Sequence, residues 1–590
     1  MRLFVVQALT VLGSLAPKAV AADHLNILFA IVMTVMLSAG LTQGQGDIGS
    51  WGDQGDSTYV NPILNGDYPD VDVEQVGDTY YMISSTQHFS PGMVILESKD
   101  MVNWTTIGHV WDRLSWGPQY NWDRMAGYPY GVYAGDFAYH DGRWYCYGSD
   151  RLYGIYMSSA EDIRGPWTEP HLVLPKEITY NDPAVFWDEE EGQTYLICNS
   201  GSKLKSEDNK TPGNENHIYK LSADGREVLD SGTVYYTGPG AEAAKIYKID
   251  GVWYIFMAER QNSGEGGNRK QIVLRSRTDS IYGPYDKKTV MEGGNGIDRS
   301  CSQGGLMQAP DGSWWYTHQL IQDCPTPFEG RPQCLQPVTW IDGWPIIGED
   351  IDNDGIGEPV LSHRKPIQGF TITAPPSDDE FDASELGPQW EWNHDPRDTH
   401  WSLTERPGWL RLKAARPVQD EDFFLPPDSV KGRDVKGKDT DFWRACNTLS
   451  QRIMGTTTGT AVARFDLSGM QPGQRAGFVR FGGVYHLCGV KVDESRKRRL
   501  FFMDLLGTET TGPEFTSNDL YIRTENIGDR AVFEFSSNGT DFQRFGPEFT
   551  IQFGRWTGDR LGFFCWNDLD PGGHLDIDYF HYEYDGPKSQ

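Results

Sequence analysis

The chain has 590 residues and a formal net charge of −31, from 52 Lys and Arg against 83 Asp and Glu. Nucleic acid is excluded as a partner, because binding to a phosphate backbone requires a basic surface. Aromatic residues at 13% and 66 glycines exclude a largely disordered chain and indicate a soluble β protein with an uncharged, flat-faced ligand.

The first 57 residues are predicted to direct export. An apolar run at 3–15 precedes Ala19-Val20-Ala21, which resembles a signal-peptidase site, so residues 1–21 are predicted to be a signal peptide. A second apolar run lies within residues 22–57 and has the length of the shortest membrane-spanning helices. Three interpretations of it stay open: a signal-like region from a wrong start or exon assignment, a membrane anchor, or a propeptide. Only the anchor conflicts with a secreted, extracellular protein.

A short pattern recurs through residues 58–374: a turn that contains Gly or an acidic residue, then alternating aromatic and aliphatic residues. Such a turn before a period-2 stretch is typical of a β-hairpin. Copies spaced by about 50–65 residues are typical of propeller blades, so five copies predict a five-bladed β-propeller. The copies are 77–82, 141–145, 191–196, 250–255 and 311–316.

A Pro- and Asp-rich break at 375–379 predicts a linker. Short alternating stretches follow it, for example 461–465 and 477–481. They predict a β-sandwich over residues 378–590. The fold class is therefore all-β, with two large domains.

Cysteines and sequons are consistent with export. The eight cysteines show no C-x-x-C pair and no metal-ligand spacing, so no metal site is predicted from them. Cys324 and Cys334 are close enough in sequence to form a disulfide, and the other cysteines are expected to be buried thiols. Three N-glycosylation sequons begin at Asn103, Asn209 and Asn538.

Three carboxylates stand in unusual local settings at the starts of blades. Asp70 follows a Gly- and Pro-rich approach, Asp182 lies in Asn-Asp-Pro, and Glu242 is surrounded by small residues. Since loops and inner-strand ends of different blades converge at one mouth of a propeller, these acids are expected to meet there. Paired carboxylates can serve as general base and general acid in glycoside hydrolysis. The alternative is that the two Asp residues cap turns and Glu242 is a surface acid.

Several motifs in the same order resemble glycoside hydrolase family 43, over residues 59–359. The opening motif is 61–70, the second-blade motif is 133–136, and the third acid lies in 181–183. The general-acid motif starts at 241–242, and 302–305 and 330–338 resemble the later blades. The tail from Glu380 resembles the concanavalin A-like (jelly-roll) sandwich of β-xylosidase-type members, which is either a scaffold or a wall of the active-site pocket.

The resemblance implies roles for individual residues. It makes Asp70 the general base, Glu242 the general acid, and Asp182 the residue that orients the acid and modulates its pKa. It places substrate contacts at Phe89, Tyr133, Gln303 and Arg331. Two motifs depart from the family pattern: Pro69-Asp70-Val71 has Val for the second Pro, and Tyr133-Ala134-Gly135-Asp136 replaces Trp-Ala-Pro-Asp.

No cofactor is expected to be required. The family often has a His near the Gln303 motif that helps to hold a channel calcium, and this chain has none there. Asp350, Asp352 and Asp354 resemble half of an EF-hand loop, but Leu361 stands where a Glu ligand is needed. An Asp-rich turn is therefore favoured over calcium.

The sequence thus predicts an inverting, exo-acting glycoside hydrolase that releases pentoses from xylo-oligosaccharides or arabinoxylan. A β-D-xylosidase is favoured because of the sandwich. The alternatives are an α-L-arabinofuranosidase or a bifunctional enzyme and, in another class, a non-catalytic carbohydrate-binding propeller.

Overall fold

The computed structural model describes residues 51–176, 180–205, 212–261, 269–297, 301–320, 327–423, 441–455, 457–504, 506–554, 556–569 and 572–588. All of them belong to the compact unit Gly49–Gln590. The predicted signal peptide and most of the second apolar segment lie outside the described residues. None of the helices in the described ranges is long and apolar enough to cross a membrane.

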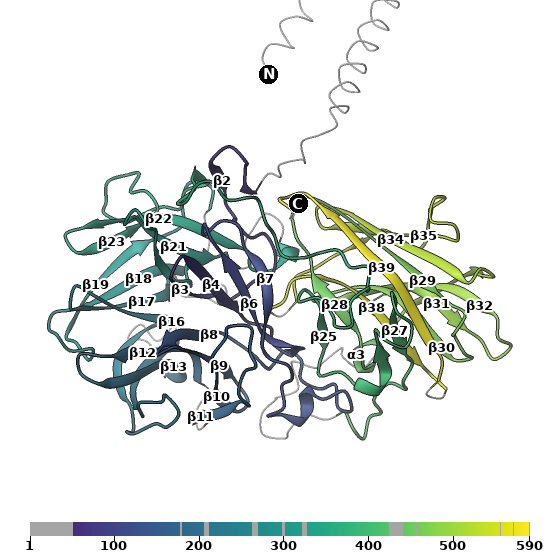
Figure 1. Ribbon diagram of the computed structural model, residues 1–590, viewed down its shortest axis with the longest axis horizontal. Coiled ribbons are helices and arrows are strands. Elements are labelled where there is room, and N and C mark those ends of the chain that lie inside the picture. Colours follow the sequence, from purple (N-terminus) through teal and green to yellow (C-terminus); the bar gives the residue numbers. More distant parts are fainter. Residues whose placement is uncertain are drawn as a thin grey trace, which may run out of the picture. The chain divides into compact units, whose positions relative to one another are not determined.

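Five four-stranded antiparallel sheets form most of the N-terminal domain (Figure 1). Each repeat copy forms the hairpin between the first and second strand of one sheet, as predicted. The first strands of most neighbouring sheets contact each other. The strands are β3 (Asp72–Val76), β4 (Thr79–Ser84), β6 (Gly92–Ser98) and β7 (Thr105–Trp111); β8 (Gly135–His140), β9 (Arg143–Asp150), β10 (Gly154–Ala160) and β11 (His171–Pro175); β12 (Tyr180–Asp188), β13 (Gln193–Lys205), β14 (Pro212–Leu221) and β15 (Thr233–Pro239); β16 (Glu242–Ile249), β17 (Val252–Arg260), β18 (Arg269–Ser276) and β19 (Tyr285–Met291); and β20 (Leu306–Gln308), β21 (Trp314–Gln319), β22 (Gln333–Ile341) and β23 (Trp344–Ile347).

A sixth sheet corrects the prediction of five blades. It has three short strands, β1 (Gly52–Asp53), β2 (Thr58–Val60) and β24 (Ser362–Arg364), which pair in the order β1-β2-β24. The described propeller domain therefore has six sheets. The repeat pattern missed this sheet because its strands are only two or three residues long and come from opposite ends of the domain.

Side chains, four of the five buried, tie each four-stranded sheet to the next. In every case an oxygen atom of one sheet accepts a hydrogen bond from a backbone N–H at the inner strand of the following sheet, which satisfies buried polar groups. The last contact joins the fifth of these sheets to the first and closes the ring. The pairs are Asp72 with Phe137 (3.0 Å), Asp136 with Val185 (2.9 Å), Asp182 with Ala243 (2.9 Å), Gln271 with Gln303 (3.2 Å) and Gln319 with Asp70 (2.8 Å).

Two eight-stranded sheets form the C-terminal β-sandwich, as predicted. Strand β29 alternates buried and less buried residues, as expected when one face of a sheet packs on a core. A few short helices, α3 (Asp441–Arg444), η2 (Pro118–Tyr120), η3 (Pro327–Glu329) and η4 (Asp398–His400), connect the strands of the two domains. One sheet contains β33 (Glu509–Glu514), β32 (Arg498–Met503), β31 (Tyr485–Val492), β30 (Gln474–Phe481), β38 (Arg560–Asn567), β28 (Leu449–Arg452), β25 (Glu391–Asn393) and β5 (Phe89–Ser90); the other contains β26 (Trp401–Ser402), β27 (Leu410–Lys413), β39 (His574–Tyr584), β29 (Thr458–Asp466), β34 (Asp519–Ile527), β35 (Arg530–Ser536), β36 (Gln543–Arg544) and β37 (Phe549–Thr550).

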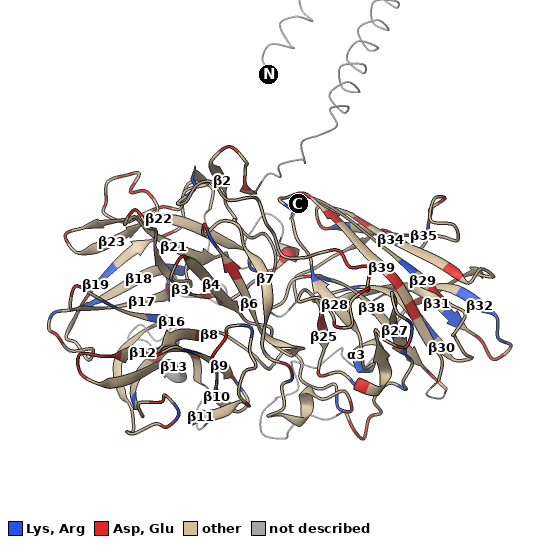
Figure 2. Cartoon of the chain, viewed as in Figure 1, with Lys and Arg blue, Asp and Glu red and all other residues tan. Residues whose placement is uncertain are grey.

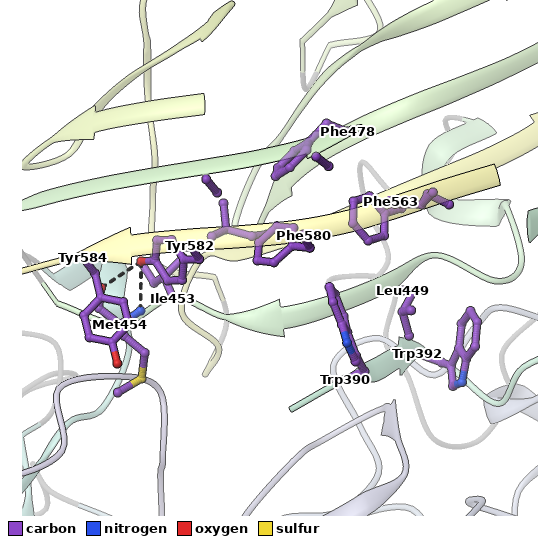
Figure 3. Packing of buried hydrophobic residues seen from close by; sticks show 14 of the residues in the cluster. Trp390, Trp392, Leu449, Ile453, Met454, Phe478, Phe563, Phe580, Tyr582 and Tyr584 are labelled. Atoms are coloured by element: carbon purple, nitrogen blue, oxygen red, sulfur yellow. Dashed lines mark hydrogen bonds between the residues drawn. The ribbon is translucent and has the colours of Figure 1, made fainter. Parts of the chain in front are cut away.

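Aromatic side chains fill the core between the two sandwich sheets (Figure 3). The ring of Phe563 lies 5.5 Å from that of Trp390 and 5.8 Å from that of Phe580, between ring centroids. At one end of this core, the Tyr582 hydroxyl accepts a hydrogen bond from the Met454 N–H and donates one to the Met454 carbonyl. The polar end of the buried tyrosine is thereby satisfied.

A propeller segment is part of the sandwich. Strand β5, which follows the second strand of the first blade, pairs with β25 in register Trp392–Ser90 and Asn393–Phe89. Beside it, the buried Glu391 carboxylate binds Arg560 and, at 2.9 Å, Arg452. Burial opposes ionisation of Glu391, but the two guanidinium groups hold its pKa below the ordinary value. The junction between the domains is therefore a continuous sheet with a paired charge next to it.

The structure bears on the sequons and the disulfide. Asn103 is 6% exposed, and its Nδ2 donates to Asp53 and Asp100, both at 2.7 Å. These contacts argue against a glycan at Asn103. Asn538 lies in an exposed turn. Asn209 and Cys324 lie outside the described residues. Glycosylation at Asn209 and Asn538 and the disulfide between Cys324 and Cys334 therefore stay predictions. Acidic residues are spread over both domains (Figure 2).

Candidate active site

The three predicted acids lie at the starts of inner strands. Asp70 precedes β3, Asp182 lies near the start of β12, and Glu242 is the first residue of β16. Asp70 and Asp182 have φ values of 55° and 50°, and Ala243, after Glu242, has 58°. Few residues other than glycine adopt this left-handed conformation, and such strain clusters at functional sites.

Irregular strand pairing accompanies this backbone. The register shifts in β12 between Asn181 and Ala184, and in β16 between Glu242 and Lys245. Bulges of this kind change the direction in which a side chain points. The local structure therefore departs from regular β geometry at the positions that carry the predicted chemistry.

Three donors hold the carboxylate of Asp70, which is 7% exposed. Arg331 Nη1 donates to Oδ1 at 2.6 Å, Ser85 Oγ donates to Oδ2 at 2.9 Å, and Gln319 Nε2 lies 3.4 Å from Oδ1. The oxygen atoms of Asp70 are thus fixed in direction, which suits a group that must take a proton from a water molecule in one position.

Asp182 links the other two acids. Its Oδ2 accepts hydrogen bonds from the Ala243 N–H at 2.9 Å and from Asn199 Nδ2 at 3.1 Å. Burial, with a further contribution from the negative charge of Asp70, raises the pKa of Asp182 to about 6. Asp182 therefore holds the backbone beside Glu242 and is also close enough to Asp70 for their charges to interact.

Glu242 forms an ion pair with Arg269, which is on β18 of the same sheet. Both side chains are partly accessible, with 24% of Glu242 and 11% of Arg269 exposed. Sequence reasoning missed Arg269 because no local motif marks it. The guanidinium group of Arg269 compensates the negative charge of Glu242.

Arg331 connects Asp70 with the sandwich. Its Nη2 donates to the Trp556 carbonyl at 3.2 Å, and its guanidinium lies 5.6 Å from the centroid of the Trp556 ring. The Arg331 N–H donates to Asp67 Oδ1 at 3.1 Å, and Asp67 Oδ2 accepts from the Gly558 N–H at 2.9 Å. A sandwich loop is therefore bound to the residue that orients Asp70.

Gln303 lies on the same network. It has a φ of 65° and is nearly buried, and its Oε1 accepts a hydrogen bond from Gln319 Nε2 at 2.7 Å. Gln319 thus bridges Gln303 and Asp70. The sequence contained the predicted Gln303 in a family-like motif, but Gln319 has no such signal.

Two predicted substrate contacts have other surroundings. Phe89 is 2% exposed, and the Arg560 guanidinium lies 3.6 Å from its ring centroid within the aromatic cluster at the domain junction. This burial argues against sugar stacking on Phe89. Tyr133 donates its hydroxyl to the Pro129 carbonyl at 2.8 Å, with Arg151 5.8 Å from its ring. Its contact with substrate stays a prediction.

The Asp-rich loop brings three carboxylates close together. One ligand oxygen from each of Asp350, Asp352 and Asp354 lies within 4.8 Å of the others. The same carboxylates accept hydrogen bonds from backbone N–H groups, such as that of Gly355 at 3.0 Å and that of Ile356 at 2.8 Å. These contacts are typical of an Asp-rich turn, which the loop forms from its own residues.

The chain is similar to known proteins over nearly its whole length. Residues 59–345 match Glycosyl hydrolases family 43, and residues 378–583 match the Beta xylosidase C-terminal Concanavalin A-like domain. A protein of Formosa agariphila named Beta-xylosidase is 61% identical over 551 residues, which cover 92% of this chain and 93% of that protein. A Bacteroides ovatus protein named Non-reducing end alpha-L-arabinofuranosidase is 32% identical over 371 residues, with 60% and 65% covered.

Two solved structures are similar to this chain over most of its length. A Bacteroides eggerthii protein described as Bifunctional GH43-CE superposes with a TM-score of 0.73 at 29% identity, covering 89% of this chain and 63% of that one. A GH43 glycoside hydrolase engineered to show endo-xylanase and exo-arabinofuranosidase activity has a TM-score of 0.73 at 25% identity, with 89% and 99% covered.

Proposed function

Because the chain belongs to glycosyl hydrolase family 43, we propose that it is a β-D-xylosidase. It removes single pentoses from xylo-oligosaccharides or arabinoxylan, acting from the chain end and with inversion. The observation that carries this proposal is the network of Asp70, Asp182 and Glu242, in which Asp182 bonds to the residue after Glu242 and interacts with the charge of Asp70. The 61% identity to a protein named Beta-xylosidase supports the choice of sugar.

The proposed reaction is a single displacement. Asp70 takes a proton from water as the water oxygen forms its bond to the anomeric carbon. Glu242 gives its proton to the glycosidic oxygen as the bond between that oxygen and the anomeric carbon breaks. Because its pKa is raised to about 6, Asp182 is mostly protonated only below that pH, and there it adds little charge repulsion to the site.

Arg269 pairs with Glu242, so its guanidinium can neutralise the carboxylate that remains after Glu242 has given up its proton. Exo action is supported by the sandwich loop at Trp556, which is bound to Arg331 and suits a wall at one side of a pocket.

An α-L-arabinofuranosidase, alone or combined with xylosidase activity, is the second candidate. It is favoured by the Bacteroides ovatus relative of that name, and the two pentoses can present similar hydroxyl groups to one pocket. The non-catalytic alternative is disfavoured because all three acids are present together with their partners.

One assay tests these alternatives. The purified protein is given nitrophenyl β-D-xyloside and nitrophenyl α-L-arabinofuranoside, and the first anomer formed is identified by proton NMR. We expect faster release from the xyloside and α-xylose as the first product. Faster release from the arabinofuranoside would transfer the assignment to the second candidate, and β-xylose as the first product would exclude inversion. No turnover of either substrate would support a binding protein.

Export and metal independence complete the proposal. We expect the N-terminus of the mature extracellular protein to begin after residue 21 or after the second apolar run, and Edman or mass-spectrometric sequencing reads this directly. Recovery of the protein only in the membrane fraction would indicate an anchor.

We also expect activity to survive chelation by EDTA, and loss of activity that calcium restores would contradict this.

A further inference from the structure

Gln319 stands at the point where the ring of four-stranded sheets closes. It is the last residue of β21, and its side chain is fully buried. Its Oε1 accepts a hydrogen bond from the Asp70 N–H at 2.8 Å, and its Nε2 donates to Gln303 Oε1 at 2.7 Å and lies 3.4 Å from Asp70 Oδ1. One amide group therefore contacts both the backbone and the carboxylate of Asp70.

The hydrogen-bond pattern fixes the orientation of this amide. A backbone N–H only donates, so the atom that faces the Asp70 N–H must be the oxygen of Gln319. The nitrogen then has to face Gln303 and the Asp70 carboxylate, which supply acceptors. A flipped amide would lose both contacts with Asp70.

The position of Gln319 itself is also fixed. Its N–H donates to the Ser302 and Gln303 carbonyls, and its carbonyl accepts from His318 Nδ1 at 3.2 Å. His318 Nε2 accepts in turn from Gln336 Nε2 at 3.0 Å, because Gln336 Oε1 already accepts from the Val360 N–H. Burial lowers the pKa of His318 to about 4, so this ring stays neutral around pH 7.

We infer that Gln319 is a positioning residue for the reaction: it holds Asp70 in its left-handed conformation and couples the general base to Gln303. This inference rests on the proposed function of Asp70. Without the acceptor of Gln319, the buried Asp70 N–H loses its partner and the strained backbone can relax. A displacement of about 1 Å at a reacting group can reduce turnover by about 100-fold.

Several charged groups surround Asp70. Arg331 contacts it directly, while Asp182 on β12 and Arg269 on β18 interact with its charge. Removing the Gln319 donor leaves these groups in place. Because the carboxylate of Asp70 then loses one donor, the acidic limb of the kcat/KM profile is expected to move to higher pH.

The test compares Gln319→Met with Gln474→Met. Both residues are fully buried glutamines whose Oε1 accepts a hydrogen bond from a backbone N–H, but Gln474 lies on β30 of the sandwich and accepts from Gln471 at 2.9 Å. We expect Q319M to lower kcat by about 10- to 100-fold with KM within about twofold, and to move the acidic limb upward. Q474M is expected to lower Tm and to keep kcat and the limb. If Q319M keeps both values of the parent, or if Q474M reproduces its effects, the inference is wrong.

Two further variants keep the test decisive. Q319E retains the side-chain volume and the acceptor for the Asp70 N–H. The acidic limb of its kcat/KM profile can therefore be measured if Q319M does not fold. The acidic limb of Q319E is expected to move further upward than that of Q319M, because a second carboxyl group then faces Asp70. If the limb of Q319E does not move, Gln319 is not coupled to Asp70. The D70N variant distinguishes a wrong role for Asp70 from a wrong role for Gln319. Full activity in D70N overturns the proposed function of Asp70, whereas an inactive D70N with a normal Q319M overturns the inference alone.

Discussion

The centre of the propeller and the core of the sandwich differ in what holds them together. The sandwich core consists of aromatic and aliphatic side chains, such as Phe563 among Trp390, Phe478 and Phe580. Around Asp70 and Asp182, by contrast, the contacts are hydrogen bonds and charge pairs on a strained backbone. Apolar packing tolerates small shifts in direction, whereas a hydrogen bond does not. A change in the first region should therefore affect stability, and a change in the second should affect chemistry.

The largest effect is expected from Asp70→Asn. Asn keeps the size of the side chain but cannot take the proton from water, so kcat should fall by about 10⁴-fold, the upper end for general base catalysis. Steady-state kinetics on the nitrophenyl xyloside and the Tm of the same preparation check this. A loss of Tm as large as that of a core variant would contradict the expectation that changes near Asp70 affect chemistry rather than stability.

Phe563→Ala is the matching change in the sandwich core. Removing a buried aromatic ring is expected to destabilise the protein by about 3–5 kcal/mol, measured by urea unfolding. The kcat of the folded fraction at low temperature should remain near that of the parent. If kcat falls in proportion to stability, the core and the site are more tightly coupled than their contacts indicate.

Trp556→Ala tests the place where the two regions meet. Loss of the ring beside Arg331 is expected to reduce kcat/KM by about 3- to 10-fold, the range of a single cation–π contact. Trp409→Ala is the control, since Arg406 lies 3.7 Å from the centroid of that ring within the sandwich. Equal activity of the two variants would confine the role of the sandwich to support.

The smallest expected effect is a gain in stability. The folded-state pKa of Asp182 is raised from 3.8 to about 6, so its contribution to stability is fully present below pH 3.8 and is lost as the pH rises through about 6. Asp182→Asn removes this titration. Relative to the parent, its free energy of unfolding should rise over that interval and then stay higher by on the order of 1 kcal/mol, after allowance for partial exposure, and its Tm should rise with it. A Tm difference independent of pH would contradict the assignment.

Local patterns predicted the repeated hairpins and both domain types, because each blade and each sandwich strand carries its own signal. The family-like motifs led to Asp70, Asp182 and Glu242. Contacts between distant segments were not predictable in this way. Phe89 looked available for stacking because nothing near it in sequence indicates that β25, about 300 residues later, covers it. Arg269 and Gln319 were missed for the same reason, since their roles depend on partners in other strands or sheets.

The pairing of β5 with β25 has a consequence for dividing the chain. A cut at the linker would leave a hydrophobic propeller segment and an unprotected sheet edge, which promotes aggregation. The propeller prepared alone is therefore expected to be poorly soluble, although its sequence boundary is clear. The intact protein should melt in one calorimetric transition, so that the two domains gain and lose their native state together.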